Sequence, residues 1–227
     1  WEIRPYTMNA YLMVDPASSK KKESNRTAMA VVGVDANYNK YLLDGVCHRM
    51  SLSERWETLK RLRIKWKRAP GIREVKTGYE RYGAQSDIEH FREMMRIDGS
   101  SFPIYELNWV GGGGSQSKKD RIQRLEPDLK DGSFFWPYPT DKKRLTSLQR
   151  DAKEGKKDFL ISSKIMRKDE NGKLYDLVKW VKDNEYSLFP TIHPDFLDAL
   201  SRIYDMDPTP PISRSYRVLE PEAEAIY

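Results

Sequence analysis

Short apolar runs separated by polar turn residues indicate a group of strands in the first part of the chain. Residues 11–14 form one such run, which ends at Asp15 and is stopped by Pro16. This pattern predicts a buried strand with a carboxylate at its C-terminal end. Further strands are predicted over residues 27–35 and 40–48, joined by a polar turn. Strands with such short connections form an antiparallel meander.

A helical spacing follows the meander. Ser51 and Glu54 have the spacing of a capping box, and apolar residues recur every three or four positions, which predicts a helix over residues 51–68. The pattern then alternates between strand and helix, with elements predicted at residues 72–80, 87–97 and 102–110. Strands joined through helices run parallel. If the first and fourth strands are neighbours, Asp15 and Glu80 therefore share one edge of the sheet.

The second half of the chain has a weaker apolar pattern. Four glycines precede a basic helix predicted over residues 115–124. Shorter elements are predicted after it: a strand or aromatic loop at 132–137, a charged helix at 142–157, and accessory elements at 159–167 and 173–186, the last one helical. A final helix is predicted over residues 191–204, with Pro194 and Asp195 in its first turn.

The C-terminal residues 207–227 are rich in proline and lack apolar periodicity, so we expect an extended or disordered tail. Residues 1–206 are expected to form one α/β domain, because the 227-residue chain is long enough for one sizeable core. Its fold class is a mixed sheet with a five-stranded core, an antiparallel meander followed by parallel strands, flanked by helices.

Composition narrows the class of protein. Cys47 is the only cysteine, which excludes a disulfide framework within the chain and favours a reducing compartment. No apolar run approaches the length of a membrane span. The formal net charge of +6 favours a polyanionic partner. Double-stranded DNA is the partner that we predict.

The basic residues are clustered, and these clusters are the candidate contacts to phosphates. A solvated charged face is the alternative for each of them. The predicted DNA-binding residues are Lys20, Lys21, Lys22, Arg61, Arg63, Lys65, Lys67, Arg68, Lys118, Lys119, Arg121 and Arg124.

Three carboxylates stand at element ends. Asp15 and Glu80 end strands, and Asp195 opens the last helix. Aspartate is a common turn residue, so a turn or cap is the simple interpretation of Asp15. If the three converge, their mutual repulsion requires bound cations, and oxygen ligands suit Mg²⁺ or Mn²⁺. Two such ions about 4 Å apart can activate water and stabilise a leaving oxygen in phosphodiester cleavage.

Five motifs, in order, resemble the C-terminal nuclease domain of the large terminase subunits of tailed phages, within the ribonuclease H-like superfamily. They are Val14-Asp15-Pro-Ala, Val34-Asp35-Ala-Asn with Tyr41-Leu-Leu-Asp44-Gly, Tyr79-Glu80-Arg-Tyr-Gly-Ala-Gln85, Lys118-Lys-Asp-Arg-Ile122 and His193-Pro-Asp195-Phe-Leu-Asp198-Ala-Leu200. The likeness spans about residues 11–204.

The resemblance implies an endonuclease that cuts concatemeric viral DNA during genome packaging. It implies that Asp15, Glu80 and Asp195 are catalytic residues that hold two Mg²⁺ or Mn²⁺ ions. The family often has two adjacent acids where this chain has Pro194 and Asp195, so Asp198 and His193 are kept as reserve ligands.

The same resemblance implies partners and a location. The partners are an N-terminal ATPase domain, a small terminase subunit and a portal, and the location is the cytoplasm of an infected bacterium. The chain begins at Trp1 and has no Walker A sequence, so we expect the C-terminal half of a longer protein that does not hydrolyse ATP by itself.

Two other functions fit the same pattern. One is a resolvase- or transposase-like nuclease of the same fold, which a preference for branched DNA would distinguish. The other is a non-catalytic DNA-binding module whose acids no longer hold metal. DNA affinity without Mg²⁺-dependent cleavage would distinguish that module.

Overall fold

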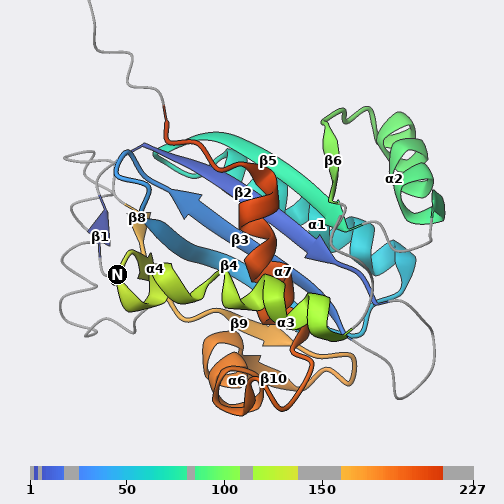
Figure 1. Cartoon of the computed structure of the whole chain (residues 1–227). Helices are drawn as coiled ribbons and strands as arrows, with labels where there is room; N and C mark the ends of the chain where they lie inside the picture. Colours follow the sequence, from blue (N-terminus) through green and yellow to red (C-terminus); the bar gives the residue numbers. More distant parts are fainter. Residues whose placement is uncertain are drawn as a thin grey trace, which may run out of the picture.

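The structure is a computed structural model that describes residues 3–4, 7–17, 26–80, 85–107, 115–137 and 160–211. Figure 1 shows the elements in chain order. The strands are β1 Ile3–Arg4, β2 Met8–Asp15, β3 Thr27–Val34, β4 Lys40–His48, β5 Ile72–Glu80, β6 Ile104–Leu107, β7 Phe134–Phe135, β8 Leu160–Ile161, β9 Met166–Lys168 and β10 Leu174–Asp176. The helices are α1 Leu52–Lys67, α2 Gln85–Asp98, α3 Ser115–Gln123, α4 Glu126–Lys130, α6 Leu177–Asn184, η1 Tyr186–Leu188, α7 Asp195–Ser201 and η2 Arg202–Met206.

A six-stranded sheet in the order β6-β5-β2-β3-β4-β7 forms the centre of the fold. Strands β2, β3 and β4 form the predicted antiparallel meander. Strand β5 pairs parallel with β2, and β6 pairs parallel with β5. All five predicted core strands are present, and the short β7 adds a sixth beside β4. With helices on both faces, this is the expected α/β fold class: a mixed sheet in which an antiparallel meander is followed by parallel strands.

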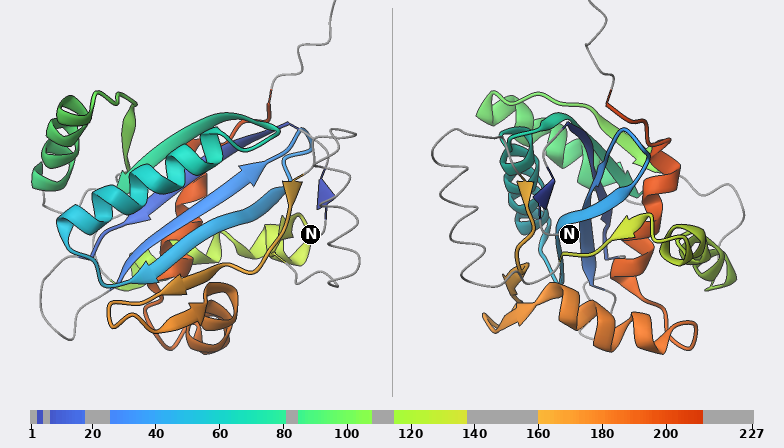
Figure 2. Two further views of the ribbon diagram at one scale, coloured as in Figure 1. Left: turned by 180° about the vertical axis from the view of Figure 1, so that it is seen from behind. Right: turned by 90° about the vertical axis from the view of Figure 1, so that its left-hand side faces the viewer.

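Each face of the sheet has its own apolar core. Alternate residues of β2 point to opposite faces, so Tyr11 and Met13 join the core under α7, whereas Leu12 and Val14 join the core under α1. Figure 2 shows α1 running across the face opposite to α7. The predicted capping box begins α1: the Ser51 hydroxyl accepts from the Glu54 N–H, and the Glu54 carboxylate accepts from the Ser51 N–H.

The C-terminal helical segment approaches the sheet closely at Gly78. A Cβ atom at this position would lie 2.5 Å from the sulfur of Met206 and 2.8 Å from a methyl carbon of Leu107. Because glycine leaves this space open, η2 packs directly on β5, two residues before Glu80. The glycine therefore helps to bring the end of β5 and the last helical segment together.

The second half of the fold departs from the predictions in several places. The last helix begins at Asp195 and continues as a tighter 3-10 turn from Arg202, so Pro194 is the residue before the helix and does not belong to its first turn. Residues 174–176 are a strand that pairs with β9, and only 177–184 of the predicted accessory helix are α-helical. Strand β6 is shorter than predicted, and residues 108–110 and 142–157 lie outside the described residues.

Side chains from the β9–β10 hairpin cover the part of β4 that β7 does not pair. The Arg167 guanidinium donates to the Gly45 carbonyl at 2.9 Å. The Tyr175 hydroxyl accepts from the Cys47 N–H at 3.1 Å and donates to the Cys47 carbonyl at 3.3 Å. These contacts satisfy backbone groups at an edge that would otherwise be open to pairing with another chain.

Residues 207–211, the described start of the predicted tail, have no regular secondary structure but lie against β2. The Thr209 N–H donates to the Tyr11 hydroxyl at 2.8 Å, and the Thr209 carbonyl accepts from the Asn9 side-chain amide at 3.0 Å. The rest of the tail lies outside the described residues. Within the described part of the chain, none of the helices combines the length and the apolar character that crossing a membrane requires.

Candidate metal centre

Strands β2 and β5 bring Asp15 and Glu80 to the same edge of the sheet. The two strands are parallel neighbours, with Val14 opposite Tyr79, so the next residue of each is an acid at the strand end. Tyr79 belongs to the core under α1, and alternation therefore turns Glu80 to the face that carries α7. Asp15 shares that face with Tyr11 and Met13. The strand pairing alone thus places two carboxylates side by side.

A third carboxylate, Asp198 of α7, completes a group of acids. Asp15, Glu80 and Asp198 each offer a carboxylate oxygen, and these oxygens lie within 4.8 Å of one another. The three residues are 5%, 6% and 2% exposed. The Oε2 atom of Glu80 is buried and has no hydrogen-bond partner among the described residues. An all-oxygen set with an unsatisfied oxygen fits a hard divalent ion such as Mg²⁺ or Mn²⁺.

Asp195, one turn earlier on α7, lies beside this group but is not a member of it. One carboxylate oxygen accepts from the Arg26 N–H at 2.8 Å, and the other accepts from the Lys118 ammonium at 3.0 Å. His193 is exposed and also lies outside the group. The structure therefore brings together Asp15, Glu80 and the reserve residue Asp198, and the ligand role of each residue stays a prediction.

Three cations from α3 and the residue directly after it face α7 and η2. The Lys118 Nζ lies 3.0 Å from Asp195, 3.4 Å from Asp198 and 3.8 Å from Asp15. Arg121 donates to both oxygens of Asp198, from Nε at 2.9 Å and from Nη2 at 2.7 Å. Arg124 binds Asp205 at 2.7 Å. These three predicted phosphate contacts are thus engaged by carboxylates, while Lys119 is half-buried.

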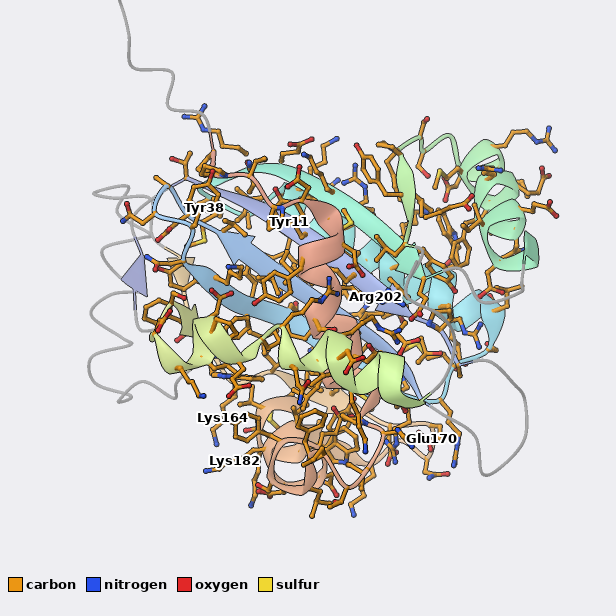
Figure 3. The ribbon with its side chains drawn as sticks, viewed as in Figure 1. Tyr11, Tyr38, Lys164, Glu170, Lys182 and Arg202 are labelled. Atoms are coloured by element: carbon orange, nitrogen blue, oxygen red, sulfur yellow. The ribbon has the colours of Figure 1, made fainter. Side chains whose placement is uncertain are left out.

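Arg202 completes the charge pattern from η2. It is fully buried, and its guanidinium binds both Glu80 and Asp205. Figure 3 labels this side chain beside α7, where the helical segment crosses the sheet. Arg202 follows Asp198 by four residues, a spacing at which two side chains of one α-helix can pair. The structure pairs Asp198 with Arg121 instead, since Arg202 lies beyond the end of α7 and faces β5.

A buried glutamate that sequence analysis missed fixes the start of α7. The Glu185 carboxylate accepts from three successive N–H groups, those of Asp195, Phe196 and Leu197, at 2.9–3.1 Å. Glu185 therefore caps the N-terminus of α7, although it lies ten residues before Asp195 in the sequence. No sequence signal identifies it, because capping boxes and N-cap preferences are local patterns and Glu185 belongs to the end of another helix.

The pKa values of the site follow from burial and crowding. Burial raises the pKa of the Asp15 carboxyl to about 7; Lys118 opposes this rise, and Asp198 and Asp195 add to it. Burial alone would lower the pKa of the Lys118 ammonium, but the surrounding aspartates raise it above its ordinary value. Burial also raises the pKa of Glu185 to about 7, although the amides of Phe196 and Leu197 favour its ionised form.

The basic run at the end of α1, residues 61–68, does not lie near the candidate metal centre. Arg55, near the start of α1, donates to the carbonyl of Ala17, two residues after Asp15. From there the helix runs toward the start of β5, where Ile72 pairs with Met8 at the other end of β2. Strand β2 has eight residues, which corresponds to roughly 25 Å. The end of α1 is thus on the other face of the sheet and far from Asp15.

Individual residues of this run have local partners. Lys65 pairs with the buried carboxylate of Asp44 at 2.6 Å, and Arg63 stacks on the Phe102 ring. Arg61, Lys67 and Arg68 are exposed. The structure does not bring any of these five cations to Asp15, Glu80 or Asp198. Lys20, Lys21 and Lys22 lie outside the described residues.

Comparison with known proteins does not establish a function for the chain. No protein-family model and no curated protein matches the chain. Among solved structures, the chain is similar to the Holliday junction resolvase of fowlpox virus, with 12% identity and a TM-score of 0.35. The match covers 56% of this chain and 78% of the resolvase. The function proposed below therefore rests on the geometry of the site.

Proposed function

We propose that this chain is a metal-dependent nuclease that hydrolyses phosphodiester bonds of DNA. The observation that carries the proposal is the convergence of buried Asp15, Glu80 and Asp198, whose oxygens lie within 4.8 Å of one another. Such a group is costly to keep ionised without a cation. The unpartnered Oε2 of Glu80 supplies a ready ligand atom. A bound divalent ion would supply an activated water and would stabilise charge on the departing oxygen.

The residues of the chain have distinct roles in this proposal. Asp15 and Glu80 supply ligand oxygens to the ion, Asp198 borders the same space, and Asp195 and Glu185 fix the start of α7 so that Asp198 faces the strand ends. Lys118 brings a positive charge to the same place, where it can pair with a phosphate. The net charge of +6 also favours a polyanionic substrate.

The finer assignment is a terminase nuclease domain that cuts concatemeric DNA during viral packaging. It is supported by the order of the five sequence motifs alone, and so are the two-ion mechanism and the partners, an ATPase domain, a small terminase subunit and a portal. The infected bacterial cytoplasm belongs to the same proposal. A packaging nuclease should cut linear duplex DNA with little sequence preference, because its contacts are mostly to phosphates.

One observation favours a second candidate, a non-catalytic DNA-binding module. Lys118, Arg121 and Arg202 already compensate most of the carboxylate charge without any ion. In such a module, the acids and bases would form a structural ion-pair network. DNA would then bind without being cut.

A cleavage assay separates these functions. The wild-type chain is incubated with supercoiled plasmid, linear duplex and four-way branched DNA, in Mg²⁺, Mn²⁺ or EDTA. Asp15→Asn is compared with Asp35→Asn, because both residues are 5% exposed but Asp35 lies at the far end of the meander. We expect metal-dependent cutting that Asp15→Asn abolishes and Asp35→Asn retains.

Other outcomes have definite meanings. Strong preference for branched DNA would favour the resolvase-like alternative that the sequence leaves open. DNA binding without cutting in any metal would favour the binding module. Equal cutting by wild type and a folded Asp15→Asn variant would contradict the proposed site.

A further inference from the structure

Arg121 binds Asp198 through two hydrogen bonds, whereas an ordinary ion pair has a single close contact between the two charged groups. Its Nε and Nη2 atoms bind the two oxygens of Asp198 at 2.9 and 2.7 Å, so each oxygen of that carboxylate accepts from the same guanidinium. The Nη2 atom also lies 3.9 Å from the Oε1 atom of Glu80. One planar cation thus bridges two of the three acids in the group.

The position of Arg121 is fixed by its surroundings. The residue is 4% exposed, and its neighbours Ile122 and Leu125 belong to the apolar core under α7. Arginine stays charged at any pH that the fold tolerates. An ion that took both oxygens of Asp198 would have to displace a buried guanidinium from this carboxylate, which is strongly unfavourable.

The charges of the site limit how many ions it accepts. The carboxylates of Asp15, Glu80, Asp195 and Asp198 face the cations of Lys118, Arg121 and Arg202. Four negative charges against three positive charges leave one negative charge. One divalent ion gives a single positive charge, which matches one phosphodiester. Two divalent ions give three positive charges in a buried space, where like charges repel strongly.

We propose that Arg121 occupies one of the two cation positions that a two-ion site requires, so that the chain binds a single divalent ion at Asp15 and the Oε2 side of Glu80. This inference rests on the proposed nuclease function and replaces the two-ion expectation drawn from the family resemblance. Arg121 is then a positioning residue: it neutralises Asp198 and holds it against Glu80.

Counting bound ions tests this inference without relying on activity. The whole chain is freed of metal with EDTA and dialysed. It is then titrated with Mn²⁺, and free Mn²⁺ is followed by its electron paramagnetic resonance signal. The proteins are wild type, Arg121→Met, Arg124→Met and Asp15→Asn. Arg124 is the matched control, because it is the next arginine along the chain, directly after the end of α3, but binds Asp205.

We expect one ion in wild type, one in Arg124→Met, two in Arg121→Met and none in Asp15→Asn. The count doubles in Arg121→Met because both oxygens of Asp198 become ligand atoms. Two ions in wild type, or any count other than two in a folded Arg121→Met protein, would overturn the inference while leaving the nuclease proposal intact. No ion in wild type would instead overturn the metal site on which both proposals rest.

A second measurement covers the case in which Arg121→Met does not fold. Arginine Nε–H groups that donate to a buried carboxylate give nuclear magnetic resonance signals protected from solvent exchange. Arg121→Lys, which keeps the charge, assigns the Arg121 signal by its loss. We expect that signal to persist in wild type at saturating Mg²⁺. Its disappearance on adding Mg²⁺ would show that the ion displaces Arg121, and the inference would be wrong.

Discussion

Helices α1 and α3 both carry dense runs of lysine and arginine, yet their cations have different partners. Lys118 and Arg121 of α3, and Arg124 directly after it, face inward and bind carboxylates of α7 and η2. On α1, Arg61 and Arg68 are exposed on the other face of the sheet. The two helices differ in which residues they turn toward their neighbours: α3 turns Lys118 and Arg121 toward the acids of α7, whereas α1 buries Trp56, Leu59, Leu62 and Trp66.

This comparison shows that a charge run in a sequence does not specify its own role. The same residue types neutralise the acids of the candidate metal centre in one helix, whereas Arg61 and Arg68 meet solvent in the other. Four experiments test the contrast, from the largest expected effect to the smallest.

The largest effect is expected at Lys118. Lys118→Ala removes an ammonium group that lies within 4 Å of three carboxylates, and we expect DNA cleavage to slow by about 100-fold or more. Lys67→Ala on α1 should change the rate less than twofold. Single-turnover rates at saturating DNA measure both. Similar losses in the two variants would mean that the site does not depend on α3 in particular.

The next effect concerns the start of α7, on which the α3 contacts depend. Glu185→Ala removes the acceptor of three N–H groups, and we expect a loss of about 2–3 kcal/mol in the free energy of unfolding. Asp176 caps α6 by accepting from two N–H groups, and Asp176→Ala should cost only about 1 kcal/mol. Urea denaturation followed by circular dichroism compares them. An equal cost would show that Glu185 is an ordinary cap.

Asp15 should make the metal-free protein less stable as pH rises. Its pKa is about 7 in the fold against an ordinary value of 3.8, so the native state holds this proton more tightly than the unfolded chain. The stabilisation is therefore fully present below pH 4 and is lost as pH rises through 7. In EDTA at pH 8, Asp15→Asn should melt roughly 3–6 °C above wild type.

Metal provides the control for that experiment. Mg²⁺ should raise the melting temperature of wild type at pH 8 and leave that of Asp15→Asn unchanged, because only the carboxylate binds the ion. A wild-type protein that is equally stable at pH 5 and pH 8 in EDTA would contradict the burial argument.

The smallest effect is expected on α1. The double variant Arg61→Ala, Arg68→Ala should alter DNA affinity less than twofold and leave the slope of log affinity against log salt unchanged. If these residues met phosphates, each lost contact would reduce that slope by about 0.9. A reduction of the slope by about two would show that α1 contacts DNA. The two helices would then differ only in their distance from Asp15, Glu80 and Asp198.

The sequence predicts the strands well because their signals are local. Continuous apolar runs bounded by turn residues identify β2, β3 and β4, and the capping box identifies the start of α1. The edge shared by Asp15 and Glu80 follows from topology alone, since parallel neighbours end on the same side. These features need no knowledge of side-chain packing.

The partners within the site are not predictable in the same way. The choice between Asp195 and Asp198 depends on where α7 begins, and that is set by Glu185 through contacts across a loop. The pairing of Arg121 with Asp198 spans 77 residues. Such contacts depend on how two helices lie over the sheet, which a pattern of residue types along one chain does not encode.

The contact between Thr209 and β2 has a practical consequence for cutting the domain out of the chain. Tyr11 is fully buried, and its hydroxyl has Thr209 as its partner, three residues beyond the predicted domain end at 206. A recombinant chain that ends at residue 206 lacks Thr209. The Tyr11 hydroxyl and the Asn9 amide would then lose these hydrogen bonds, and this part of β2 would be exposed to solvent. We therefore expect expression boundaries placed at 211 or later to yield more soluble protein than boundaries placed at the end of the last helical segment.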